Sequence, residues 1–81
     1  MKYKTQGVCA STIDIEMDNN IVKSVNFTGG CNGNLQGISA LVKDMPAQEA
    51  IQRLKGIRCG FKNTSCPDQL ANALESILAN N

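Results

Sequence analysis

The chain has 81 residues, of which 42% are hydrophobic, so it is long enough for one domain with a thin core and too short for two. Its 8 basic and 7 acidic residues leave a net charge of +1, which does not suggest a protein that binds nucleic acid or an anionic membrane, because both functions need a concentrated basic patch. We expect a cytoplasmic protein, because the N-terminus lacks the apolar core of a signal peptide and no apolar run is long enough to cross a bilayer.

Strands are predicted in the first third of the chain. A short strand is expected at residues 3–6. Residues 12–17 alternate between apolar and polar side chains, which is the pattern of a half-buried strand. Residues 18–20 (Asp-Asn-Asn) favour a turn, because Asn and Asp tolerate the left-handed backbone conformation. Residues 21–27 form the next strand, so the two longer strands are expected to pair as an antiparallel hairpin.

Helices are predicted in the rest of the chain. The first presents an apolar stripe made of Leu35, Ile38, Leu41, Val42 and Met45. Pro46 ends this helix and can begin the second, which is expected to run over residues 47–54 and to stop at Gly56. The last helix begins within residues 64–68, whose serine, proline and aspartate are typical of a helix N-terminus.

The order of these elements predicts the fold class. Strands come first and helices follow, and each element has a single apolar face. We therefore expect an α+β domain over residues 1–81, in which a small antiparallel three-stranded sheet has two to three helices packed on one face. No repeat, linker or low-complexity segment indicates a second domain.

The cysteines carry the clearest chemical signal in the sequence. They are Cys9, Cys31, Cys59 and Cys66. None lies at an apolar position of a predicted helix or strand, where buried structural cysteines usually occur. In a reducing compartment this favours a metal or thiol chemistry over structural disulfides. Cys66 also lies at a predicted helix N-terminus, where the helix dipole favours the thiolate form.

The sequence favours one shared thiolate site. Histidine is absent, so a metal would need sulfur or oxygen ligands. Four thiolates suit a tetrahedral Zn²⁺ ion, and an iron–sulfur cluster is the alternative cofactor. There is no Cys-x-x-Cys motif, so the fold itself must bring the ligands together. Two further interpretations stay open: a redox-active dithiol, for which Cys59 and Cys66 are the expected pair, and four unrelated cysteines.

Residues 64–68 read Thr-Ser-Cys-Pro-Asp and resemble the signature of the TSCPD domain family, and the resemblance extends over nearly the whole chain. That family includes short four-cysteine proteins and the C-terminal region of adenosylcobalamin-dependent ribonucleoside-diphosphate reductases. The resemblance implies an accessory or regulatory module linked to ribonucleotide reduction and DNA synthesis, with a reductase or another protein as its partner. We do not expect a complete enzyme, because 81 residues cannot supply the reductase's radical-bearing barrel.

The layout of the cysteines is also similar to that of the NifU/IscU-type iron–sulfur scaffold. Three cysteines match its positions after the first strand, in a glycine-rich turn before a helix, and at the start of a late helix. These are Cys9, Cys31 and Cys66. The chain departs from the scaffold at Ser11, where an aspartate is usual, at Ser65, where a histidine is usual, and at the additional Cys59. These departures imply an all-thiolate site and leave cluster assembly as the alternative function.

Overall fold

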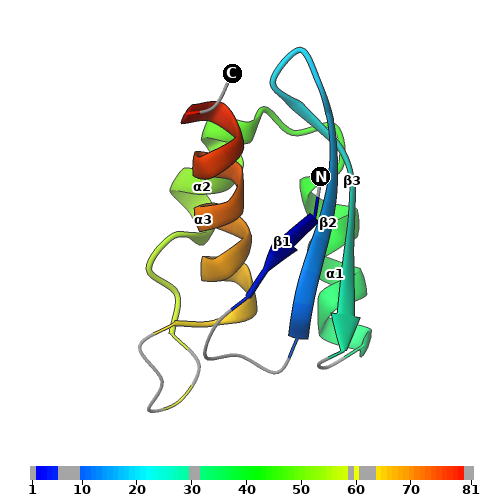
Figure 1. The fold of residues 1–81 in the computed structure, drawn as a ribbon, viewed down its shortest axis with the longest axis vertical. Helices are drawn as coiled ribbons and strands as arrows, with labels where there is room; N and C mark the ends of the chain where they lie inside the picture. Colours follow the sequence, from blue (N-terminus) through cyan, green and yellow to red (C-terminus); the bar gives the residue numbers. More distant parts are fainter. Residues whose placement is uncertain (1, 6–9, 30–31, 59, 61–63, 80–81) are drawn as a thin grey trace.

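A three-stranded antiparallel sheet and three helices form the fold (Figure 1). This computed structural model describes residues 2–5, 10–29, 32–58, 60 and 64–79. The elements are β1 (Lys2–Lys4), β2 (Ala10–Asp18), β3 (Ile21–Gly29), α1 (Asn32–Val42), α2 (Ala47–Leu54) and α3 (Cys66–Ala79). The predicted α+β class is therefore confirmed. None of the described helices is long and apolar enough to span a bilayer.

The sheet has the strand order β1-β2-β3, and its register gathers the apolar side chains on one face. Ile13 lies opposite both Tyr3 and Phe27, and Ile15 lies opposite Val25. Directly paired residues in antiparallel strands project from the same face of a sheet. The alternation in the sequence thus produces one apolar face, on which Ile13 and Ile15 are completely buried.

The turn between β2 and β3 is the one that the sequence predicts. Its two residues, Asn19 and Asn20, have φ angles of 52° and 65°. Two-residue hairpin turns of type I′ need positive φ at both central positions, and asparagine adopts that conformation more readily than most residues. The turn therefore sets the register of the hairpin that carries most of the sheet.

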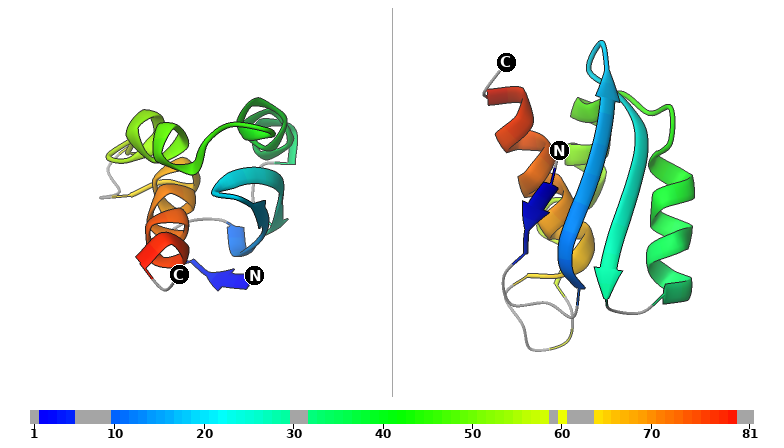
Figure 2. Two further views of the ribbon diagram at one scale, coloured as in Figure 1. Left: turned by 90° about the horizontal axis from the view of Figure 1, so that it is seen from above. Right: turned by 45° about the vertical axis from the view of Figure 1, so that its right-hand side comes forward.

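All three helices contribute to a single core on the apolar face of the sheet. Figure 2 shows α1 alongside β3 and α2 alongside α3. The buried members of this core include Ile13, Ile15, Val22, Val42, Ile51, Leu70 and Leu74. Because residues from the sheet and from each helix meet in one cluster, the predicted packing of helices on one face is confirmed.

The first helix ends earlier than its apolar pattern predicts. It stops at Val42, and Asp44 has a φ of 66°. The chain then pairs with the edge of β3: the Asp44 N–H donates to the Val22 carbonyl at 2.7 Å, and the Val22 N–H donates to the Met45 carbonyl at 2.9 Å. These bonds satisfy backbone groups at the start of an edge strand, and they require residues 44–45 to leave the helix.

The prediction that Leu41 faces the core is wrong. Its side chain is 76% exposed, whereas Leu35 and Val42 on the same helix are buried. Since α1 lies beside the edge strand rather than across the centre of the sheet, it buries only a narrow stripe. Leu41 is one residue before Val42, and successive helical residues point about 100° apart, which carries it outside that stripe.

Candidate metal centre

The structure describes one of the four predicted ligands. Cys66 is the first residue of α3 and is partly exposed. Cys9, Cys31 and Cys59 lie outside the described residues. Among the residues that the structure does describe, no three His, Cys, Asp or Glu side chains are grouped closely enough to hold a metal ion. The four-cysteine site therefore stays a prediction. The structure informs this prediction through the described residues that lie next to each cysteine in the sequence.

These neighbours gather at one end of the domain, the lower end in Figure 1. Ala10, which follows Cys9 in the sequence, is paired across the sheet with Gly29, the last residue of β3. The N–H of Thr5 donates to the carbonyl of Ser11 at 3.0 Å, which holds the chain beyond β1 against β2. The first turns of α1 and α3 lie toward the same end.

The first turn of α3 is capped as its sequence predicts. The hydroxyl oxygen of Ser65 accepts a hydrogen bond from the backbone N–H of Asp68 at 3.1 Å. This is the bond that an N-cap serine makes to one of the unpaired amides of a first turn. Ser65 is only 3% exposed, so the cap and the start of the helix beside Cys66 are held inside the fold.

A set of side chains that we call the polar clasp joins this first turn to the end of α2. One carboxylate oxygen of Asp68 accepts from the Gly56 N–H at 2.7 Å, and the other accepts from the Thr64 hydroxyl at 2.5 Å. The Ser65 hydroxyl donates to the carbonyl of Ile57 at 2.6 Å. The polar clasp thus consists of Thr64, Ser65 and Asp68 with their backbone partners Gly56 and Ile57.

Charge and conformation both support the clasp. The Thr64 hydroxyl and the Gly56 N–H, with a minor contribution from the positive charge of Lys55, lower the pKa of Asp68 below its ordinary value of 3.8, and together they outweigh the opposing effect of burial. Gly56 has a φ of 88°, a left-handed conformation that glycine adopts without strain and that is common just beyond a helix C-terminus. The ionised carboxylate of Asp68 is therefore a stable acceptor for the N–H of Gly56, just beyond the end of α2.

Sequence reasoning found only part of the clasp. It assigned the capping role of Ser65 and the helix-ending role of Gly56, both of which the structure confirms. The carboxylate of Asp68, which the sequence places in the helix cap, accepts instead from the Gly56 N–H and the Thr64 hydroxyl. Sequence reasoning did not connect these residues, because the contact between Gly56 and Asp68 spans 12 residues. The spacing of Thr64 and Asp68 could have indicated their contact, because side chains four residues apart can meet across one helical turn.

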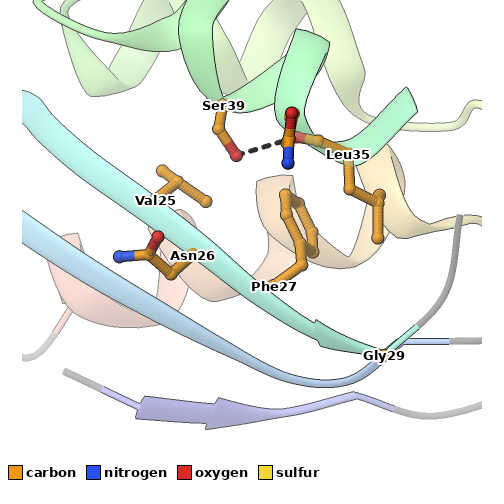
Figure 3. Close-up of a pocket in the computed structure, with 7 residues that line it drawn as sticks. Val25, Asn26, Phe27, Gly29, Leu35 and Ser39 are labelled. Carbon is orange, nitrogen blue, oxygen red and sulfur yellow. Dashed lines mark hydrogen bonds between the residues drawn. The ribbon is translucent and has the colours of Figure 1, made fainter. Parts of the chain in front are cut away.

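A shallow groove lies between β3 and α1 (Figure 3). Its volume is about 220 Å³, and it is lined by Val25, Asn26, Phe27, Gly29, Leu35, Gln36 and Ser39. The Ser39 hydroxyl donates to the Leu35 carbonyl of its own helix at 2.8 Å. None of the lining residues is charged or a thiol, so the groove offers no nucleophile–base pair and no metal ligand set.

Comparison with protein-family models matches the TSCPD domain over residues 1–78. The chain belongs to the TSCPD domain family. No match was found among curated proteins or among solved structures. In this TSCPD domain the residues that spell the family's string are 64–68, so the clasp is built largely from that string. The similarity to the NifU/IscU-type layout stays a prediction.

Proposed function

We propose that this TSCPD domain is a metal-binding accessory module in which Cys9, Cys31, Cys59 and Cys66 hold one Zn²⁺ ion. The observation that carries the proposal is the convergence at one end of the domain. The pairing of Ala10 with Gly29 brings together residues close to Cys9 and Cys31. The polar clasp joins Gly56 and Ile57, which precede Cys59 in the sequence, to Asp68 and Ser65 at the start of α3.

The donor chemistry fits this ion. Four thiolates with no histidine form a closed tetrahedral set of the kind that structural zinc sites use. Zn²⁺ bound there would cross-link the hairpin, α1 and α3, and small domains with thin cores often depend on such cross-links. An iron–sulfur cluster uses the same ligands and is the alternative cofactor.

The family supports a role beside a larger enzyme. We infer a cytoplasmic module that acts with a ribonucleotide reductase or another protein partner, because the family is linked to ribonucleotide reduction and the chain is too short for a radical-bearing barrel. A dithiol redox function of Cys59 and Cys66 is the second candidate. The bond from Ser65 to Ile57 favours it, since Ser65 precedes Cys66 and Ile57 lies two residues before Cys59.

Elemental analysis and native mass spectrometry of untagged protein test the proposal. We expect one zinc ion per wild-type chain, and loss of tight binding in the Cys9→Ser, Cys31→Ser and Cys66→Ser variants. Ala40→Ser, an equally small change at an exposed position on α1, serves as the matched control and should retain zinc. Iron with inorganic sulfide would identify a cluster instead. A metal-free protein that forms one reversible disulfide would overturn the metal site and identify the dithiol.

A further inference from the structure

We propose that the groove between β3 and α1 binds an extended, largely uncharged segment of a partner protein, which adds to the sheet as a fourth strand along Val25 and Phe27. The bound segment forms backbone hydrogen bonds with the edge of β3 and places apolar side chains between β3 and α1. This binding site goes beyond the proposed function and does not depend on metal binding.

The backbone groups of β3 alternate in direction along the strand. β3 lies at one end of the sheet order β1-β2-β3. The Ser11 hydroxyl of β2 donates to the Thr28 carbonyl at 3.2 Å, so this carbonyl faces β2. Residues 24–28 pair with β2 in unbroken register, and consecutive residues of an antiparallel strand direct their backbone groups to opposite sides. Val25 and Phe27 therefore direct their N–H and C=O groups away from β2, toward the groove.

The chain itself already pairs with one part of this edge. Residues 44–46 form a short antiparallel bridge with residues 21–22. Farther along β3, no described residue forms a backbone hydrogen bond to Val25 or Phe27 on the groove side. Unpaired N–H and C=O groups at a sheet edge are a template for another strand. A bound segment would therefore continue, along the same edge, the pairing that residues 44–46 begin.

The size and lining of the groove also fit an extended segment. Its volume of about 220 Å³ is smaller than that of ordinary small-molecule sites, which begin at about 300 Å³. Figure 3 shows Phe27 pointing from β3 toward α1, with Leu35 and Ser39 pointing back from the helix. Alternate side chains of a bound strand project to one face, so apolar ones can lie against Phe27 and Leu35. Main-chain hydrogen bonds then give affinity, and the groove selects the side chains.

The charges around the groove define the segment further. No lining residue is charged, so an uncharged segment matches both walls. Near the β2–β3 turn, the Lys23 ammonium lies 3.5 Å from the Asp44 carboxylate, which balances its charge. Lys43 is exposed and follows Ser39 by about one helical turn, and no acidic side chain among the described residues forms an ion pair with it. An acidic residue at this end of the segment complements the positive charge of Lys43.

Binding of a capped peptide of sequence Thr-Val-Thr-Val-Glu, followed by fluorescence anisotropy, tests the proposal. In an antiparallel orientation its glutamate lies at the Lys43 end of the groove. Two versions are compared, each N-methylated on one of the two sets of alternate amides. Only one set faces β3, so one version should bind about tenfold more weakly or worse, and the other as the unmodified peptide does. Equal weakening in both versions, or no binding of the unmodified peptide at about 1 mM, would overturn the proposal.

Charge reversal at Lys43 tests the orientation of the segment. Lys43→Glu should weaken binding of this peptide by about threefold and leave a version that ends in glutamine unaffected. The matched control is Lys2→Glu, the same exchange at an exposed position of β1 on the opposite edge of the sheet. Equal effects of the two substitutions would contradict the antiparallel placement in the groove.

Amide hydrogen exchange, followed by nuclear magnetic resonance, tests the location of the segment. In the free protein the N–H groups of Val25 and Phe27 should exchange faster than those of Ser24 and Asn26, and the peptide should slow them by at least about tenfold. Equal protection of all four in dilute free protein would show that the edge is already covered and would refute the proposal. Protection that appears only at high protein concentration would identify a second copy as the occupant, which also contradicts a partner segment. Absence of zinc from the wild type would contradict only the proposed metal site.

Discussion

Replacing Ser65 with alanine tests whether the clasp contributes to stability as its geometry implies. The change removes the N-cap bond to the Asp68 N–H, which costs about 1 kcal/mol. It also removes the donor to the Ile57 carbonyl, and a further bond of this kind contributes about 1 kcal/mol. We therefore expect the free energy of unfolding to fall by about 2 kcal/mol, which for a domain of this size lowers the melting temperature by about 10 °C.

The matched control is the same substitution at Ser39. Its hydroxyl also donates to a backbone carbonyl, that of Leu35, but this carbonyl is within the helix and keeps its helical partner. Alanine has the higher helix propensity, so Ser39→Ala should change stability by less than about 0.5 kcal/mol. Urea unfolding followed by circular dichroism, in reductant and at equal metal content, measures both variants. A Ser65→Ala protein as stable as Ser39→Ala would refute the reasoning.

Three further outcomes are expected. Leu74→Ala should lower the free energy of unfolding by about 3 kcal/mol because Leu74 is fully buried, whereas Leu41→Ala at a largely exposed site should change it by less than about 0.5 kcal/mol; comparable losses would contradict the burial of α3. Because the pKa of Asp68 is lowered in the folded state, the stability that its carboxylate adds is present above pH 3.8 and is lost as the pH falls through the folded-state pKa. The advantage of wild type over Asp68→Asn in urea unfolding should therefore be largest above pH 3.8 and vanish in stronger acid, and a difference that is constant with pH would argue against the clasp. A strong chelator should lower the melting temperature of the zinc-loaded protein by more than about 10 °C, and identical melting with and without chelator would count against coupling of metal binding to folding.

The parts of the candidate site that were predictable from the sequence are local ones. The cap of α3 depends on Ser65 and on an amide three residues later, and both lie within one stretch of five residues. The shared site of the four cysteines stays a prediction, made from their residue type and from the absence of histidine. The closure of the chain by Gly56 and Ile57 could not be inferred, because it depends on how α2 and α3 pack.

The sheet, the hairpin turn and the α+β class follow from the amino-acid sequence alone. Alternation at Ile13 and Ile15 creates an apolar face wherever that strand lies, and the asparagine turn follows from backbone preferences of those residues alone. Three features depend on tertiary packing: the end of α1 at Val42, the exposure of Leu41, and the hydrogen bond from the Gly56 N–H to the Asp68 carboxylate. These features depend on strand edges and helix ends that come together only when the elements pack. A backbone N–H or C=O group that is unpaired at such a place forms its hydrogen bond with whichever residue the fold places nearby.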